Sequence, residues 1–185
     1  VCESTGEGPQ ILGSYNERSS RPLLESGDAF GAQYQATLAY AGVLEARGET
    51  DAAKEWYQKA ANMKKYFNEE WGGTEGNYIH SYTKDKKTYN DFSKETTWFI
   101  AYKELAEGGE RTDAFLDFIA ESVGDGIGDT AYSPHNIEAY TYLPDVFFNY
   151  NKADTAWKYM QYIYSVKDEP HEISVQGTNG NYPEI

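Results

Sequence analysis

Apolar residues recur every three or four positions in six separate stretches of the chain, and this spacing predicts six amphipathic helices. The first stretch begins near Asp28 and ends before Gly48, a residue suited to the left-handed position that follows a helix. The predicted apolar stripes are Phe30, Tyr34, Leu38, Ala41 and Leu44; Ala53, Trp56, Ala60, Met63 and Phe67; Trp98, Phe99, Tyr102 and Leu105; Phe115, Phe118 and Ile119; Ile137, Tyr140, Leu143, Val146 and Phe147; Ala153, Trp157, Met160 and Tyr164. We therefore expect an all-α domain over residues 26–185, preceded by an extended leader over residues 1–25.

Four residues carry specific expectations about these helices. Pro144 falls inside the fifth, where its missing N–H and its ring predict a kink or a break near Leu143, at a cost of ~3 kcal/mol. The three tryptophans on the stripes are expected to lie in the core: Trp56, Trp98 and Trp157.

The links between the predicted helices alternate between short and long. Short links join the first helix to the second, the third to the fourth and the fifth to the sixth, so we expect three antiparallel helical hairpins. The long links, at about 71–92, 124–132 and 167–185, would then all lie at one end of the domain. Because functional residues concentrate on long loops that a rigid scaffold positions, we expect the site at that end. Alternating residues in the first long link predict a small β-hairpin at about 78–92.

The charge balance limits the classes of partner. Thirty acidic residues against 16 basic ones give a net charge of -14. This balance argues against binding to nucleic acid or to anionic membrane surfaces, both of which need clustered Lys and Arg. No apolar run approaches the ~20 residues of a membrane-spanning helix. The single cysteine, Cys2, excludes an internal disulfide and a cysteine-based zinc cluster.

No motif predicts a metal or a cofactor. The three histidines, His80, His135 and His171, lack the spacing of a zinc site. Residues 125–129 fail the spacing of a calcium-binding EF-hand loop, so turn formation explains their glycines and aspartates better. We expect neither a metal nor a cofactor.

Two families share features with this sequence. One resemblance covers about 20 residues and looks like a single tetratricopeptide helix pair, on the spacing of Leu44, Gly48, Ala53, Tyr57 and Ala60. This pattern does not recur at the 34-residue period of that family.

The second resemblance is broader. Tandem helical hairpins with long loops at one end resemble the (α/α) toroid of bacterial six-hairpin glycosidases, and the segments 132–148 and 177–185 look like stretches of such proteins. The likeness covers about residues 28–185 and implies a toroid-like arc. A full toroid has twice the number of helices predicted here, so the likeness implies only part of the ring or an incomplete one.

The toroid resemblance implies a carbohydrate-active domain that hydrolyses a glycan by acid/base chemistry. Such cleavage needs one carboxyl group kept protonated and another ionised. Glu138, near the start of the fifth helix, is the predicted acid, and Asp91 or Glu184 is its predicted partner. The alternatives are a charge favoured by the helix dipole for Glu138 and a turn or cap residue for Asp91.

The glycan would be bound by aromatic rings and polar side chains on the long loops. The predicted substrate-binding residues are Trp71, Tyr78, His80, Tyr132, His135, Asn136, Asn179 and Tyr182. The alternative is that about half of the loop rings belong to the core. The competing function is a non-catalytic, tetratricopeptide-like scaffold that binds protein or glycan.

Two further expectations concern location and association. The chain begins with Val1 and Cys2, and a cysteine at this place could remain from a lipid-anchored protein, although a free thiol is the simpler interpretation. With the bacterial resemblance, we expect a secreted, periplasmic or cell-surface protein. The outermost hairpins would each lack a neighbour, so we expect the leader to cover one flank and self-association to cover another, unless the natural chain is longer and closes the ring.

Overall fold

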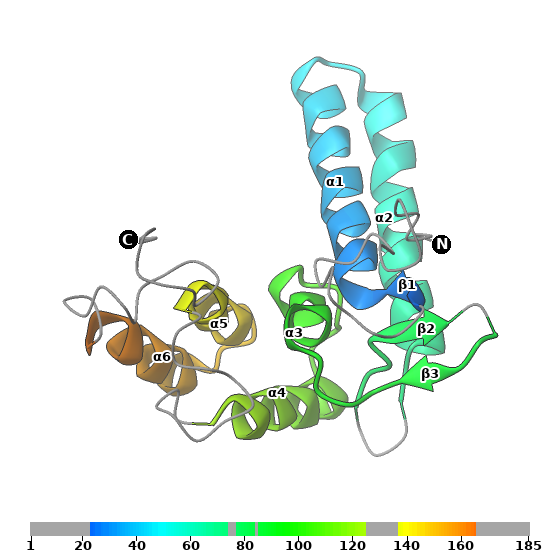
Figure 1. Cartoon of the computed structure of the whole chain (residues 1–185). Helices are drawn as coiled ribbons and strands as arrows, with labels where there is room; N and C mark the ends of the chain where they lie inside the picture. The colour runs from blue at the N-terminus through cyan, green and yellow to red at the C-terminus, as the bar shows by residue number, and fades with distance from the viewer. Residues whose placement is uncertain (1–22, 74–76, 84, 125–136, 166–185) are drawn as a thin grey trace, which may run out of the picture. The chain divides into compact units, whose positions relative to one another are not determined.

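The computed structural model describes residues 23–73, 77–83, 85–124 and 137–165 (Figure 1). The chain divides into two compact units, Val1–Thr112 and Asp113–Ile185. Most described residues are helical, and the small remainder of regular structure is one antiparallel sheet, which confirms the predicted all-α class with a small β-hairpin. None of the helices in the described ranges is both long enough and apolar enough to cross a membrane.

The elements follow the predicted order. The first unit contains β1 (Leu23–Ser26), α1 (Gly27–Ala46), α2 (Thr50–Glu70), β2 (Ser81–Thr83), β3 (Thr88–Tyr89) and α3 (Lys94–Tyr102). The second contains α4 (Glu110–Val123), whose first three residues belong to the first unit, α5 (Ile137–Phe148) and α6 (Ala153–Ser165).

The helices α1 and α2 form the long hairpin of the first unit (Figure 1). Gly48 turns the chain with a φ of 80°, as predicted, and the amide of Glu49 donates to the carbonyl oxygen of Leu44 at 2.9 Å. The buried faces of the two helices follow the predicted stripes and carry Phe30, Tyr34, Ala41 and Leu44 from α1 and Ala53, Ala60 and Phe67 from α2.

Glycines let α1 approach α3 closely. A Cβ atom at Gly31 would lie 2.8 Å from Cβ of Lys103 and 3.4 Å from the carbonyl oxygen of Phe99. A Cβ atom at Gly27 would lie 2.6 Å from the Ile100 side chain. The side-chain amide of Gln35 then donates to the carbonyl oxygen of Lys103 at 2.7 Å, which fixes α1 against the end of α3.

The sheet closes the base of this hairpin. Its strand order is β1-β2-β3, and both pairs are antiparallel. The β2–β3 pair is the predicted hairpin, whereas β1 comes from the end of the predicted leader. The amide of Gly27 donates to the carbonyl oxygen of His80 at 2.7 Å, so α1 begins directly beside the sheet.

The second unit contains the α5–α6 hairpin. Of the predicted kink or break near Leu143, the break is wrong, because helix α5 runs through Pro144, while the kink stays a prediction. The rings of Phe147 and Tyr159 lie 5.5 Å apart in the packed face. Lys152, in the connection between α5 and α6, forms a 2.7 Å ion pair with Asp113 at the start of α4, and the pKa of Lys152 is raised by this partner.

The predicted stripe of α6 is displaced by about one residue. Trp157 is 53% exposed, so its predicted place in the core is wrong, whereas Trp98 is buried and Trp56 half-buried. The buried residues of α6 are instead Ala156, Tyr159 and Tyr162. These residues lie three positions apart on one face of the helix, and their tyrosine rings provide the apolar surface that the tryptophan was expected to supply.

Two of the three predicted hairpins are confirmed. The third, α3 with α4, spans the boundary between the units and stays a prediction, as does the placement of all long links at one end. The single helical domain over 26–185 and the toroid-like arc also stay predictions. The links at 125–136 and 166–185 and most of the leader lie outside the described residues.

Replacing Gly31 with alanine should destabilise the first unit by ~1–3 kcal/mol, because the added methyl group overlaps atoms close to the α3 backbone. The matched control is Gly42→Ala in the same helix, where the nearest atom is the Tyr57 hydroxyl at 3.8 Å. This control should gain ~0.5–1 kcal/mol from helix propensity alone. Urea unfolding followed by circular dichroism measures both, and equal changes in the two variants would contradict the close approach of α1 and α3.

Candidate functional site

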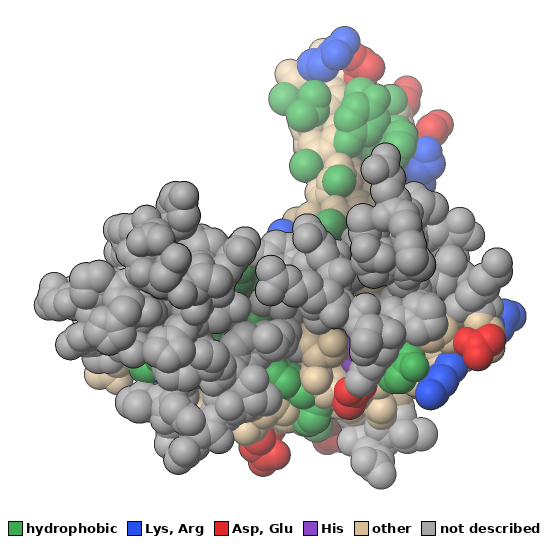
Figure 2. Space-filling view, in the orientation of Figure 1, with side chains coloured by type: hydrophobic (Ala, Val, Ile, Leu, Met, Phe, Trp, Pro, Cys, Tyr) green, Lys and Arg blue, Asp and Glu red, His purple; other side chains and the backbone are tan. Residues whose placement is uncertain are grey.

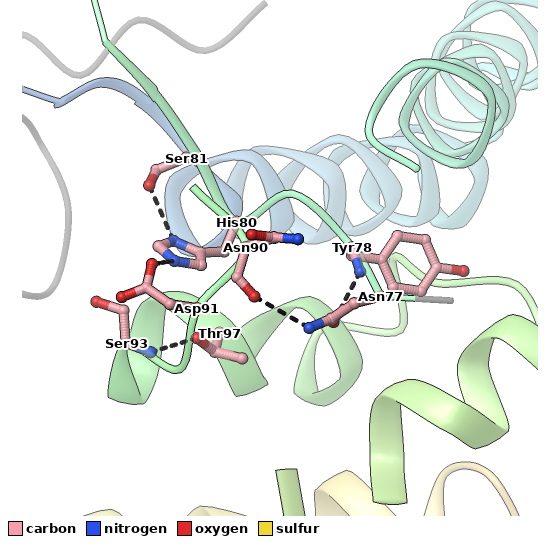
Figure 3. A network of polar contacts seen from close by, with 8 residues as sticks. All are labelled: Asn77, Tyr78, His80, Ser81, Asn90, Asp91, Ser93 and Thr97. Atoms are coloured by element: carbon pink, nitrogen blue, oxygen red, sulfur yellow. Dashed lines mark hydrogen bonds and ion pairs between the residues drawn. The ribbon is translucent and has the colours of Figure 1, made fainter. Parts of the chain in front are cut away.

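Two groups of polar side chains in the first unit are candidates for a functional site. We call the first the His80 network; its members are Asn77, His80, Ser81, Asn90, Asp91, Ser93 and Thr97 (Figure 3). We call the second the Tyr78 pocket, which is lined by Lys65, Asn68, Glu69, Tyr78, Glu107, Gly108, Gly109, Glu110, Arg111 and Thr112.

A cluster of buried rings positions the segment from which both groups arise. Trp71 lies 5.5 Å from Phe30 and 5.4 Å from Phe67 between ring centroids. Tyr78 packs on Phe67 at 5.4 Å, and Tyr82 packs edge-on against Trp71 at 4.7 Å. Such pairs contribute ~0.5–1.5 kcal/mol each beyond the area that they bury. The segment after α2 is therefore anchored at both ends by aromatic packing.

Backbone hydrogen bonds close the same segment. The amide of Gly73 donates to the carbonyl oxygen of Asn77 at 2.7 Å, and that of Ile79 donates to Trp71 at 2.9 Å. The positions of Tyr78 and His80 on this segment are therefore fixed. The Tyr78 hydroxyl contacts α2 and the start of α4, and the His80 ring contacts the residues before α3.

His80 lies at the centre of the first group. Its Nδ1 atom is 2.9 Å from Oγ of Ser81, and its Nε2 atom is 3.3 Å from Oδ1 of Asp91 (Figure 3). A carboxylate only accepts hydrogen bonds, so Nε2 carries a proton; in a neutral ring Nδ1 then accepts from the Ser81 hydroxyl. The His80 side chain is 1% exposed, whereas that of Asp91 is 50% exposed.

Neighbouring polar contacts hold the chain that carries Asp91. The Asn77 side chain donates to the carbonyl oxygen of Asn90 at 3.0 Å and accepts from the Tyr78 amide at 2.8 Å. At the start of α3, the amide of Ser93 donates to the Thr97 hydroxyl at 2.7 Å. Asp91 is therefore held on both sides, with half of its side chain open to solvent.

The residue types Ser, His and Asp are those of a nucleophilic hydrolase, but this arrangement does not present the serine. Ser81 is fully buried, so its hydroxyl has no exposed path to a substrate. Of these three side chains, only the Asp91 carboxylate reaches solvent. The network therefore suits a positioned carboxylate better than a serine nucleophile.

The Tyr78 pocket is an open hollow of about 380 Å³ between the end of α2 and the start of α4. The Tyr78 hydroxyl donates to Oδ1 of Asn68 at 3.0 Å and lies 3.0 Å from Oγ1 of Thr112. Thr112 in turn donates to the carbonyl oxygen of Glu107. These hydrogen bonds join the end of α2, the segment that carries Tyr78 and the start of α4 into one wall of the pocket.

Asn68 is the residue on which this wall converges. Its amide nitrogen donates to the carbonyl oxygens of Lys64 at 2.8 Å and Leu105 at 2.9 Å. Its amide oxygen accepts from the Tyr78 hydroxyl at 3.0 Å and from the backbone of Glu107 at 2.9 Å. The side-chain amide therefore fills all four of its hydrogen-bonding positions within the protein.

Arg111 brings a guanidinium group to the rim. It donates to the backbone oxygen of Asn68 at 2.8 Å and lies 5.7 Å from the centre of the Tyr78 ring. Gly72 makes room for it, because a Cβ atom there would lie 2.9 Å from Nη1 of Arg111. Only one of its several N–H groups is used in this bond, and the side chain is exposed.

The charges of the pocket are mixed. Lys65 lies 3.7 Å from Glu69, and the carboxylates of Glu107 and Glu110 add negative charge to a lining that also contains Arg111. Burial raises the pKa of Tyr78 and Glu107 adds to this rise, while Thr112 and Arg111 oppose it. The phenol therefore stays a neutral hydrogen-bond donor at physiological pH.

The structure places the predicted site residues in different settings. Trp71, Tyr78 and His80 are between 1% and 2% exposed and pack in the core of the first unit, so an exposed ring face for a sugar is absent at these described positions. Their predicted role in substrate binding stays a prediction. The structure does bring His80 and Asp91 together.

The remaining predicted residues fall mainly outside the described part. The backbone of Glu138 lies in the first turn of α5, where its predicted catalytic role stays a prediction. Outside the described residues lie Glu184, Tyr132, His135, Asn136, Asn179 and Tyr182.

Sequence reasoning missed Asn68, Glu107 and Arg111. The pair Gly108-Gly109 was a signal, since it predicts an end to helical structure and therefore a loop. Nothing in the sequence relates that loop to Asn68, which lies 39 positions away from the Glu107 amide that it binds.

Neither a metal-binding group among the described residues nor a match to a known family identifies the function of the site. Within the ranges that the structure describes, no group of three or more His, Cys, Asp or Glu residues is arranged to hold a metal ion. Comparison with protein-family models and with curated protein sequences gives no match.

The buried phenol predicts a pH dependence. Because the pKa of Tyr78 in the folded protein is raised above 10.0, its stabilising contribution is complete below about pH 10 and is lost as the pH rises through the folded-state value. Replacing Tyr78 with Phe should cost ~1–3 kcal/mol at pH 7 and make the free energy of unfolding fall less steeply above pH 10. Urea titrations between pH 7 and 11.5 measure this slope, with Tyr40→Phe as an exposed control. An unchanged slope in Tyr78→Phe would contradict the assignment.

Proposed function

We propose that the chain is a carbohydrate-active domain and that the Tyr78 pocket binds a sugar of the glycan. The observation that carries the proposal is the lining of the pocket, which combines a guanidinium group, carboxylates and a phenol on a wall fixed by Asn68. Sugar hydroxyl groups both donate and accept hydrogen bonds, so a mixed lining suits them. The volume lies in the range of roughly 300–1,000 Å³ that is typical of small-molecule sites.

Charge favours a sugar over an anionic ligand. Three carboxylates, Glu69, Glu107 and Glu110, line the same hollow as Lys65 and Arg111. A phosphate or sulfate group would be repelled by these carboxylates, whereas a neutral sugar can donate to them. Asn68 and Tyr78 are held by hydrogen bonds within the protein, so these two side chains lose little freedom when a ligand binds.

We further propose that the domain hydrolyses the glycan, with Glu138 as the acid and Asp91 or Glu184 as its partner. For Asp91, the support is its half-exposed carboxylate, one oxygen of which lies 3.3 Å from Nε2 of His80. For Glu138, the support is its position at the start of α5.

Replacing Arg111 with Ala should weaken binding of a captured glycan at least about tenfold, because a hydrogen bond to a charged group contributes ~1.5–3 kcal/mol. A glycan array on the whole chain identifies the ligand, and calorimetry measures its affinity. The matched control is Arg47→Ala, since Arg47 is also exposed but pairs with Glu49 at the other end of α2. Equal affinities of the wild type and Arg111→Ala would remove the Tyr78 pocket from the proposal.

Replacing Glu138 with Gln should lower turnover by ~10²–10⁴ without changing the thermal unfolding midpoint, because the amide keeps the shape and loses the acid. The assay is release of reducing sugar from a panel of polysaccharides and aryl glycosides. Glu121→Gln in α4 is the control, because Glu121 is exposed in the same unit. Full turnover in Glu138→Gln excludes it as the acid, and no turnover by the wild type on any substrate counts against hydrolysis.

A non-catalytic helical scaffold is the second candidate function. It is favoured by the exposure of large apolar side chains on both hairpins: Tyr40, Val43, Tyr57, Tyr66, Phe148, Trp157 and Tyr164. Exposed rings of this kind suit protein partners. Capture of glycans by the array without any hydrolysis would favour glycan binding alone, and absence of both would favour the scaffold.

A further inference from the structure

His80 is a buried polar residue whose backbone is held on two sides. Its amide donates to the carbonyl oxygen of Tyr89 at 2.8 Å, and its carbonyl oxygen accepts from the Gly27 amide at 2.7 Å. The next residue, Ser81, begins β2, the central strand of the sheet, and pairs with Ser26 on one side and Tyr89 on the other. A side chain carried by a backbone of this kind starts from a well-fixed position.

The imidazole ring is held as well as the backbone. The Ser81 hydroxyl lies 2.9 Å from Nδ1 of His80, and the Tyr89 ring is stacked on the imidazole with 6.5 Å between the ring centres. Because the Ser81 hydroxyl can donate to Nδ1, the proton of a neutral ring lies on Nε2. That nitrogen is 3.3 Å from Oδ1 of Asp91 (Figure 3). The contacts of the ring therefore set both the nitrogen that donates and the direction in which it donates.

The backbone that carries Asp91 is also held on both sides. Before it, the Asn77 side chain donates to the carbonyl oxygen of Asn90 at 3.0 Å. After it, the amide of Ser93 donates to the Thr97 hydroxyl at 2.7 Å. The freedom that these bonds leave to Asp91 is rotation of its own side chain, and the contact with His80 opposes this rotation.

Stability alone does not account for the contact between the two side chains. His80 is 1% exposed and Asp91 is 50% exposed. The space-filling view agrees, since acidic side chains lie at the surface and almost no histidine surface is visible (Figure 2). Burying a polar ring costs free energy, and a contact with a half-exposed carboxylate offsets little of this cost because water competes for the carboxylate. An apolar residue would fill the same space without the cost.

We infer that His80 is a positioning residue for Asp91. Its Nε2–H group holds Oδ1 and so fixes the orientation in which the exposed part of the carboxylate meets a substrate. The inference rests on the proposed hydrolysis, in which Asp91 is one of the two candidate partners of Glu138. His80 is itself too buried to touch the substrate, and it acts only through Asp91.

Two variants of His80 separate positioning from packing. The amide nitrogen of glutamine can take the place of Nε2, whereas that of asparagine can take only the place of Nδ1. Both variants lose the ring and its stacking on Tyr89, but only His80→Gln keeps a donor for Asp91. We expect turnover to be at least about tenfold lower in His80→Asn than in His80→Gln, with KM unchanged, because the reacting group is misplaced and substrate binding is not altered. Release of reducing sugar measures both constants.

Two further measurements test whether His80 acts through Asp91. Adding His80→Asn to Asp91→Asn should cause no further loss of turnover, because the carboxylate that His80 positions is already gone. The second measurement needs no substrate. The carboxyl-carbon NMR signal of Asp91, identified by its loss in Asp91→Asn, should move less in His80→Gln than in His80→Asn.

Three results would overturn this inference alone. They are an equal loss of turnover in the two His80 variants, a loss that follows their thermal unfolding midpoints, and an equal displacement of the Asp91 carboxyl signal in both. A wild type that hydrolyses no substrate is a different failure. It overturns the proposed hydrolysis and with it any role of His80 in turnover, whereas the carboxyl signal still decides whether His80 holds Asp91.

Discussion

The packing of four rings, Phe30, Phe67, Trp71 and Tyr78, is the interaction on which the first unit depends. Phe30 belongs to α1 and Phe67 to α2, so their 5.7 Å contact fixes the base of the hairpin. Trp71 and Tyr78 add the chain that follows α2 to the same cluster. That chain leads into β2, which pairs with β1 and so returns to the start of α1. The sheet, the His80 network and the Tyr78 pocket therefore all take their positions from one aromatic core, and loosening it would displace them together.

The helices could be predicted from the sequence because their signals are local. The apolar period of α1 and α2, the positive φ of Gly48 and the strand pair β2–β3 each depend on residues a few positions apart. The error in α6 has a local cause as well. Tyrosine is amphipathic, so a face built on Tyr159 and Tyr162 competes with one built on Trp157, and periodicity does not rank the two.

The candidate site could not be predicted to the same degree, because its contacts join distant positions. Asn68 binds Tyr78 and Glu107, and only the folded chain brings these residues to one place. The amphipathic nature of aromatic rings also explains why Trp71 and Tyr78 were predicted to bind a sugar. A ring on a loop between helices has the same sequence signature whether it faces a ligand or fills the space beneath the loop. Tyr78 does both. Its ring packs on Phe67 beneath the loop, and its hydroxyl forms a hydrogen bond in the wall of the pocket.

The two faces of α1 differ in how clearly the sequence indicates them. Its inner face was found from the stripe of large residues, Phe30, Tyr34 and Leu44, because size and spacing both indicate burial. Its outer face has an equally regular spacing but consists mainly of alanine, whose small surface contributes little to a search for buried stripes. Alanine is also the best helix former, so the same residues explain why α1 is stable as a long helix. The absence of charge also marks this face, because 25% of the chain is charged and α1 carries no charged residue between Asp28 and Glu45.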